Sequence, residues 1–216
     1  MKLSRETIAL LKNFATINGN LLIKPGSTIS TISAAKSVYA SADVKEVFET
    51  QFGIYDLNEF LGQISLLDDP ELTFNEKFVQ IKQGGRSFRY FGASEAVLTA
   101  PSKAIKVPAA DIEFNLSADD VNMIMKTAGV LRAPDVTISG DGTNLKVIVG
   151  DKKNTTGNDF ETTVGETQDT FQAHIKIDNF KIIPGDYVAQ IAAQKILKLS
   201  AGSLQYVLSL EADSTF

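Results

Sequence analysis

Cysteine is absent from the 216-residue chain, and histidine occurs once, at position 174. Without cysteine there is no disulfide framework, no thiolate metal ligand and no cysteine nucleophile. With one histidine and no cysteine, a catalytic zinc site lacks its usual ligands. These absences indicate a reducing compartment and argue against thiol or zinc catalysis.

Long apolar runs are also absent. No stretch approaches the roughly 20 apolar residues of a membrane span. The apolar residues that follow Lys2 and Arg5 are interrupted at Lys12 and Asn13, too early for a signal peptide. Hydrophobic residues make up 44% of the chain and charged residues 22%, as in ordinary globular proteins. We therefore expect a soluble, intracellular protein that does not bind membranes.

Motifs of catalysis are missing as well. No GxxxxGK[ST] sequence provides a phosphate-binding loop. His174 falls on the polar face of an alternating strand, where a surface residue is a simpler interpretation than a general base. Asp68 and Asp69 precede Pro70, and a turn explains them better than a cation site. The sequence predicts neither an enzyme nor a bound metal or cofactor.

Charge is unevenly distributed along the chain. The net charge of -5 argues against a nucleic-acid-binding protein if taken alone. From Asp43 to Glu76, however, nine acids face Lys45 alone, whereas six bases between Lys77 and Lys106 face only Glu95. The acidic segment can serve solubility, or it can form a surface that repels DNA, and the sequence favours neither explanation over the other.

The chain looks duplicated at about half its length. A helix start at Ser4, with a serine cap, an acid in the first turn and apolar residues at helical spacing, is repeated at Ser117. A further helix is predicted from Asp56, and a short helical turn between Asp178 and Ile183. Each half is thus expected to contain two helices.

Alternating apolar and polar residues predict antiparallel strands elsewhere, for example at 171–177 and 204–210. We expect an α+β protein with an N-terminal domain at 1–100, a proline-containing connector at 101–108 and a C-terminal domain at 109–216. The polar stretch from Asn154 to Gly165 is expected to be a mobile loop.

Three stretches carry a family resemblance: MKLSRETIALLKNFATIN at 1–18, IYDLNEFLG at 54–62 and LEADST at 210–215. They closely resemble the sliding clamps, or DNA polymerase processivity factors, of T-even-type bacteriophages. The resemblance implies the DNA-clamp fold, with two similar domains whose helices pack on antiparallel sheets. It also implies a closed ring of three identical subunits, in which helices line the hole and edge strands of neighbouring subunits pair head-to-tail.

A clamp holds duplex DNA through sparse phosphate contacts. Lys2, Arg5 and Lys12 share one stripe of the first helix with Ala9 and Thr16, while Ile8, Leu11 and Ala15 form an apolar stripe. From the pattern alone an ordinary solvated face is the better interpretation, and the resemblance reverses that preference. Lys126 and Arg132 are the corresponding residues of the second half.

The resemblance further implies partners that insert hydrophobic peptide ends into a pocket, for which Ile105, Val107, Tyr206 and Leu208 are the predicted walls. The implied partners are DNA polymerase, a separate ATP-dependent clamp loader and late-transcription factors, and the implied location is the cytoplasm of the infected bacterial host. The principal alternative is a structural, ring-forming subunit of a phage assembly, and a carboxylate-based hydrolase is a third.

Overall fold

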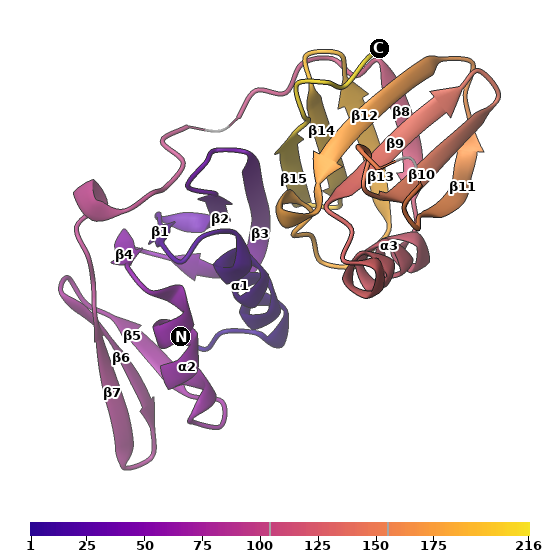
Figure 1. Ribbon diagram of the computed structural model, residues 1–216. Helices are drawn as coiled ribbons and strands as arrows, with labels where there is room; N and C mark the ends of the chain where they lie inside the picture. Colours follow the sequence, from indigo (N-terminus) through magenta and orange to yellow (C-terminus); the bar gives the residue numbers. More distant parts are fainter. Residues whose placement is uncertain (104, 155) are drawn as a thin grey trace. The chain divides into compact units, whose positions relative to one another are not determined.

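The computed structural model describes residues 1–103, 105–154 and 156–216. The chain divides into two compact units, Met1–Ala104 and Ile105–Phe216, and the division falls within the segment 101–108 that the sequence predicts as a connector. The α+β class and the antiparallel sheets expected from the sequence are confirmed (Figure 1).

Unit 1, Met1–Ala104, contains two helices and seven strands in the part that the structure describes. In chain order these are α1 (Arg5–Ile17), β1 (Leu21–Ile23), β2 (Gly26–Ile32), β3 (Val38–Phe48), β4 (Phe52–Ile54), α2 (Leu57–Ser65), β5 (Glu71–Phe74), β6 (Phe78–Gln83) and β7 (Arg86–Phe91), followed by a 3₁₀ turn, η1 (Glu95–Val97). β1 pairs with β4, β2 pairs with β3, and β5, β6 and β7 form a sheet in that order, all antiparallel.

Unit 2, Ile105–Phe216, contains one α-helix and eight strands among its described residues. Its elements are β8 (Ile112–Leu116), α3 (Ala118–Leu131), β9 (Asp135–Asp141), β10 (Asn144–Gly150), β11 (Phe160–Glu166), β12 (Thr170–Lys176), the 3₁₀ turn η2 (Ile177–Asn179), β13 (Tyr187–Ala192), β14 (Ile196–Ala201) and β15 (Leu204–Ser209). One sheet has the order β11-β10-β9-β12. In the second sheet, β8 pairs with β13, β13 with β14 and β14 with β15, all antiparallel.

The helices begin where the sequence predicts, because capping side chains are present at each start. Ser4, Asp56 and Ser117 each accept a hydrogen bond from a backbone N–H in the first turn, and Ser117 forms a reciprocal capping box with Asp120. α1 packs against α2 and β3, and α3 packs against β10 (Figure 1). The caps fix where each helix begins, and the packing leaves the opposite helix faces exposed.

The predicted helix between Asp178 and Ile183 is instead the single 3₁₀ turn η2. β12 continues to Lys176, and Pro184 and Gly185 follow soon afterwards, so the intervening segment is too short for a stable α-helix. The predicted loop between Asn154 and Gly165 is also shorter than expected, because β11 begins at Phe160 and pairs with β10. Position 155 of that loop lies outside the described residues.

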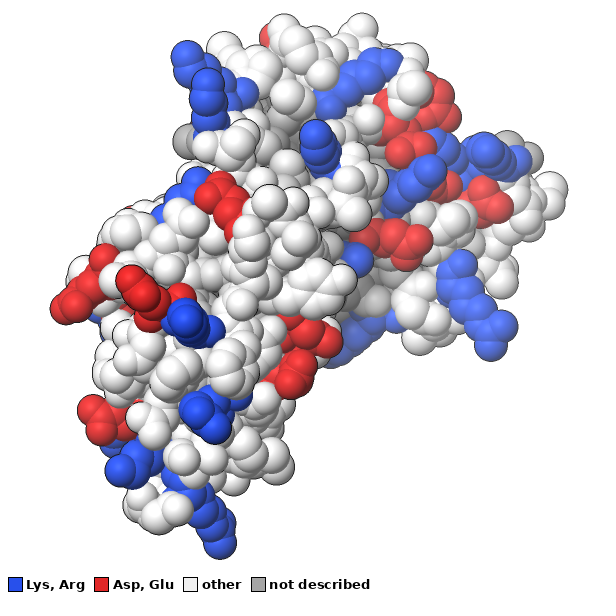
Figure 2. Space-filling view, turned by 90° about the vertical axis from the view of Figure 1, so that its left-hand side faces the viewer, with Lys and Arg blue, Asp and Glu red and all other residues white. Residues whose placement is uncertain are grey.

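The core of each unit lies between its helices and sheets. In unit 1, Phe14 of α1, Phe60 of α2 and Ile81 of β6 are at most 1% exposed. In unit 2, Val121 of α3, Leu199 of β14 and Tyr206 of β15 are all 0% exposed. The interiors are thus largely apolar, and most charged side chains lie on the surface, where Figure 2 shows acidic and basic groups interspersed with uncharged ones; Glu46 and Asp135 are buried exceptions.

Candidate DNA-binding face and neighbouring grooves

The start of α1 is fixed by a buried carboxylate from a distant strand. Glu46 of β3 is 8% exposed. Its carboxylate accepts hydrogen bonds from the backbone N–H of Ser4 and from the hydroxyl of Thr7, the latter at 2.6 Å. Burial alone would raise the pKa of Glu46, but these hydrogen bonds outweigh burial and hold the pKa below its ordinary value.

The stripe predicted on α1 is exposed. Arg5, Ala9, Lys12 and Thr16 all lie at the surface, and neither Arg5 nor Lys12 forms an ion pair with another residue of the described chain. The buried face of α1 differs from the predicted apolar stripe. Its buried residues are Thr7, Leu10, Leu11, Phe14 and Ile17. Ile8 and Ala15 are only half-buried. The two basic side chains remain available for an anionic ligand.

Lys2 lies at the same end of unit 1 but is already neutralised. Its ammonium forms an ion pair with Asp69, and that hydrogen bond and charge raise the pKa of Lys2. Lys2 and Asp69 are both well exposed, so the pair contributes little to stability. Of the three basic residues predicted on this stripe, Lys2 is therefore the least available to DNA.

A groove of about 410 Å³ runs between α1 and α2. Ile8, Leu61 and Ile64 contribute apolar lining, and Arg5 and Lys12 lie along it. Asp68 and Asp69, which follow α2, line the same groove. Two acids of the segment 43–76 therefore lie close to the basic stripe.

The second half provides fewer charges. On α3, Lys126 is exposed, and Arg132 occupies the C-terminal cap with a left-handed backbone, φ 51°. The exposed face of α3 is otherwise largely apolar, since Met123 is 49% exposed and Val130 is 82% exposed. A cation at the C-terminal end of a helix is favoured by the helix dipole.

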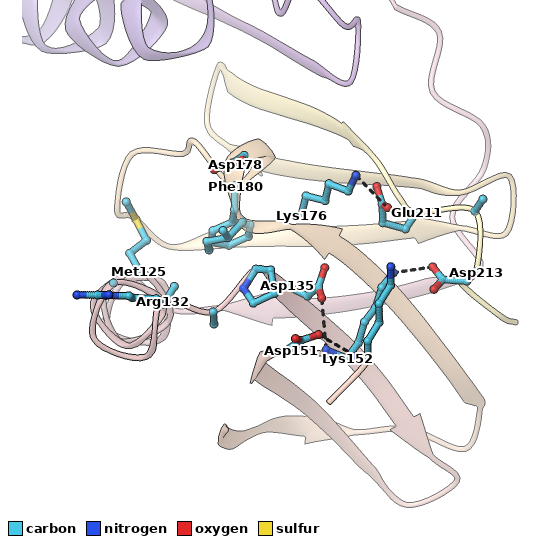
Figure 3. Close-up of a pocket in the computed structure, with 17 residues that line it drawn as sticks. Met125, Arg132, Asp135, Asp151, Lys152, Lys176, Asp178, Phe180, Glu211 and Asp213 are labelled. Carbon is cyan, nitrogen blue, oxygen red and sulfur yellow. Dashed lines mark hydrogen bonds and ion pairs between the residues drawn. The ribbon is translucent and has the colours of Figure 1, made fainter. Parts of the chain in front are cut away.

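Arg132 also lines a groove of unit 2 that has a volume of about 960 Å³ (Figure 3). Phe180, Pro134 and Ile177 provide apolar surface. Two ion pairs connect the groove wall to the C-terminal segment: Lys176 with Glu211 at 3.6 Å and Lys152 with Asp213 at 2.7 Å. The sequence did not indicate this groove, because its lining comes from separate segments of the chain.

His174 is buried, which corrects the prediction of a surface position. It is 8% exposed, and its Nδ1 lies 2.8 Å from Oγ1 of Thr137 on β9. The C-terminal segment covers the edge of β12, where Ser214 accepts a hydrogen bond from the His174 backbone N–H. Burial lowers the pKa of His174, and the charge of Lys152 lowers it further. A neutral, hydrogen-bonded core histidine fits these contacts.

The four predicted pocket walls do not form one accessible surface. Tyr206 and Leu208 are both 0% exposed and belong to the core of unit 2. The Tyr206 hydroxyl accepts a hydrogen bond from the backbone N–H of Ile183, and burial raises the Tyr206 pKa. Ile105 is 38% exposed and Val107 is half-buried, so these two remain accessible.

The described residues contain no group of three or more acidic, histidine or cysteine side chains arranged to hold a metal ion. Within the same residues, no helix is both long and apolar enough to cross a bilayer. What the arrangement offers is a small number of exposed cations on helix faces, which suits sequence-independent phosphate contacts.

Comparison with known proteins gives a consistent result. The family model for DNA polymerase processivity factors matches residues 3–106. The sliding clamp of Vibrio phage KVP40 is 34% identical over 98% of this chain and 100% of its own length. The sliding clamp of Enterobacteria phage T4 is 33% identical over 100% of this chain and 99% of its own length.

Solved structures show the same fold. The PCNA of A. fulgidus, determined with the C-terminal region of FEN-1 bound, matches with a TM-score of 0.73 at 10% identity over 100% of both chains. The DNA polymerase III subunit beta of Pseudomonas aeruginosa matches with a TM-score of 0.69 at 12% identity, over 100% of this chain and 65% of that one. At such low identity these two matches establish the architecture alone.

Proposed function

Because this chain belongs to the sliding clamp family of DNA polymerase processivity factors, we propose that it encircles duplex DNA and tethers the replicative polymerase to its template. The observation that carries the proposal is the identity of 34% and 33% with two phage sliding clamps across essentially the whole chain. Both units are included in those matches. The alternative of a structural subunit in a phage assembly has no comparable support.

The clamp acts as a closed ring of three copies. A ring retains DNA by topology, so its direct contacts with DNA need not be strong. Each copy contains an edge strand in either unit, which is the arrangement that head-to-tail assembly requires. Equilibrium sedimentation over a range of concentrations tests the stoichiometry, and a monomer or dimer as the largest species would refute it.

Arg5 and Lys12 of α1 and Lys126 and Arg132 of α3 contact DNA phosphates. Their exposure supports this assignment, as does the absence of ion pairs at Arg5 and Lys12 among the described residues. The exposed apolar side chains of Met123 and Val130, one helical turn to either side of Lys126, limit how many phosphates this helix can bind at once. A clamp that binds few phosphates moves along DNA without sequence preference.

Partners bind through short peptide ends. The solved complex of an archaeal PCNA with the C-terminal region of FEN-1 supports this mode of binding for the present fold. Ile105 and Val107 are the accessible members of the predicted pocket. The partners are DNA polymerase, an ATP-dependent loader that opens the ring, and late-transcription factors. The clamp itself catalyses no reaction, needs no cofactor and acts in the cytoplasm of the infected bacterium.

Retention on circular DNA tests the function directly. Protein loaded onto nicked circular duplex DNA by the loader and ATP should stay bound through gel filtration at high salt. Cutting the circle with a restriction enzyme should release it within the time of the experiment, because only the topological link remains. Release that does not depend on cutting, or copurification with phage particles instead of DNA, would contradict the proposal.

A further inference from the structure

The segment that leads into the connector is held against unit 1 by two asparagine side chains. Residues 93–99, here called the strap, precede the connector at 101–108 and end at Thr99. The carbonyl of Thr99 accepts a hydrogen bond from Nδ2 of Asn18 at 2.7 Å, and its N–H donates to Oδ1 of Asn20 at 3.1 Å. The two asparagines, which lie in the turn after α1, therefore bond both backbone groups of the residue that ends the strap.

The side-chain amide of Asn18 has three partners. Its nitrogen also donates to the carbonyl of Ile32, the last residue of β2, at 2.8 Å, and its oxygen accepts from the backbone N–H of Asn20 at 2.9 Å. A carboxamide, with two donors beside an acceptor, satisfies two carbonyls and one N–H at once. Asn18 is also the C-cap of α1, where its backbone N–H donates to the carbonyl of Phe14. One residue thus ends the proposed DNA-binding helix and holds the start of the connector.

The beginning of the strap packs closely on β4. The backbone N–H of Ala93 donates to the carbonyl of Gly53 at 2.9 Å. A Cβ at position 53 would lie 2.3 Å from the carbonyl oxygen of Ala93 and 2.8 Å from Cδ1 of Leu98, so glycine permits this close approach. The strap is therefore fixed to unit 1 at its start by β4 and at its end by the two asparagines.

Fixing Thr99 restricts the connector that follows. Ile105 comes six residues later, and an extended chain spans at most about 3.6 Å per residue, so Ile105 stays within about 22 Å of the fixed Thr99. A peptide that docks on Ile105 and Val107 has to order the connector, which costs conformational entropy. That cost is smaller when the connector starts from a fixed point.

We propose that Asn18 and Asn20 are positioning residues for partner binding, which hold the start of the connector so that Ile105 and Val107 are presented to a peptide end. This rests on the proposed function, to which it adds two residues that act through the connector. Loosening the strap should therefore weaken peptide binding even though the apolar anchors are unchanged.

Two substitutions release Thr99 from opposite sides. Asn18→Asp is nearly isosteric and keeps the oxygen that accepts from Asn20, but it turns a carboxylate toward two carbonyls. Asn20→Ala removes the acceptor of the Thr99 N–H and provides the same measurements if Asn18→Asp does not fold. Because the chain contains no cysteine, Ser102→Cys places a spin label at one exposed position of the connector. The spectrum of this label should become that of a more mobile side chain in either variant.

Asn75→Asp is the matched control. Asn75 is exposed in the turn between β5 and β6, where its amide donates to the carbonyl of Thr73 at 3.3 Å. The substitution makes the same chemical change away from the strap and should leave the label and the peptide affinity at their parent values. In unlabelled proteins shown by sedimentation to form the ring, Asn18→Asp and Asn20→Ala should each raise the Kd of a polymerase C-terminal peptide by at least about fivefold.

A double-mutant cycle separates positioning from a general loss of structure. In a chain that already carries Ile105→Asp, the further change Asn18→Asp should raise the Kd by less than about twofold, because the connector then has no anchor to present. Thermal unfolding verifies that each variant is folded.

Three results would overturn the inference while the clamp function stands. A label that stays immobile in both variants would show that the asparagines do not hold the connector. A mobile label with an unchanged Kd would show that holding it does not assist the peptide. Fully additive effects of Asn18→Asp and Ile105→Asp would show that Asn18 acts by another route. A parent that binds no peptide would overturn the role in partner binding, and retention on circular DNA tests the clamp function separately.

Discussion

The hydroxyl of Thr7 donates a hydrogen bond of 2.6 Å to the carboxylate of Glu46, which lies 39 residues further along the chain. The same carboxylate accepts from the backbone N–H of Ser4. Arg5 lies between these two anchored residues. A buried acid on β3 thus sets the position of the first basic side chain on the proposed DNA-binding face.

We predict that Glu46→Gln lowers the free energy of unfolding by about 1–3 kcal/mol at pH 7, because a charged hydrogen-bond acceptor is replaced by a neutral one. The pKa of Glu46 is lowered in the folded state, so its stabilising contribution is full above the ordinary value of 4.5 and is lost as the pH falls through the folded pKa. The difference between parent and variant should therefore shrink below about pH 4.

Urea unfolding of the two proteins between pH 3 and pH 7 measures that difference. Glu49→Gln is the matched control, since Glu49 is exposed just after β3. The control should follow the parent at every pH. A constant difference between Glu46→Gln and the parent over the whole range would show that the carboxylate charge does not contribute.

We predict that Arg5→Ala combined with Lys12→Ala weakens clamp loading and processive synthesis. The free energy of unfolding should change by no more than about 0.5 kcal/mol, because both side chains are exposed and form no ion pair within the described chain. The salt dependence of DNA binding should become shallower, by about 0.9 in slope for each phosphate that is no longer neutralised. Lys24→Ala with Lys103→Ala removes the same charge elsewhere and should have no such effect. Normal synthesis by the first variant at physiological salt would exclude the stripe from the DNA-binding face.

Helix positions were predictable because their determinants are local. Ser4 and Ser117 cap the helices that follow them, and apolar residues at helical spacing identify the buried faces. The exposed stripe on α1 follows from the same periodicity. Antiparallel strands such as β12 and β15 were predictable from alternation for an equivalent reason.

Interactions between distant segments were not predictable. Alternation placed His174 on a polar face, but the C-terminal segment packs along the edge of β12 and buries it. Nothing near Glu46 in the sequence indicates that its carboxylate accepts hydrogen bonds from Ser4 and Thr7 at the start of α1. Likewise, Lys2 forms an ion pair with Asp69, which lies 67 positions further along the chain. The residues of the predicted stripe alone could therefore not show that one of its cations is neutralised.

We predict that Ile105→Asp raises the Kd of a polymerase C-terminal peptide by at least about tenfold while the ring remains intact, because a charge would then oppose burial of an apolar anchor. Leu208→Ala should behave differently. It removes a fully buried side chain and should cost about 2–5 kcal/mol of stability. Calorimetric titration of the peptide measures the first effect and urea unfolding the second. Equal peptide affinity for Ile105→Asp and the parent would remove Ile105 from the pocket.

The pH dependence of unit 2 should be governed in part by His174. Its folded pKa is lowered, first by burial and then by the charge of Lys152, so the unfolded chain binds a proton more readily than the folded chain. Stability is therefore lost as the pH falls through the ordinary histidine pKa of about 6.5 and continues to fall until the folded pKa is reached.

We predict that His174→Gln flattens this dependence, because glutamine can still hydrogen-bond to Thr137 but cannot be protonated. At pH 8 the variant should be less stable than the parent by about 1–2 kcal/mol, since the packing around the ring and the 2.8 Å hydrogen bond with Thr137 are altered. Between pH 7 and pH 5 the parent should lose stability faster than the variant, so the two curves converge. Thermal unfolding across this range measures both slopes, with Thr137→Val as a control that removes the hydrogen bond but keeps the titrating group. Parallel slopes for the parent and His174→Gln would show that His174 is not the group that titrates.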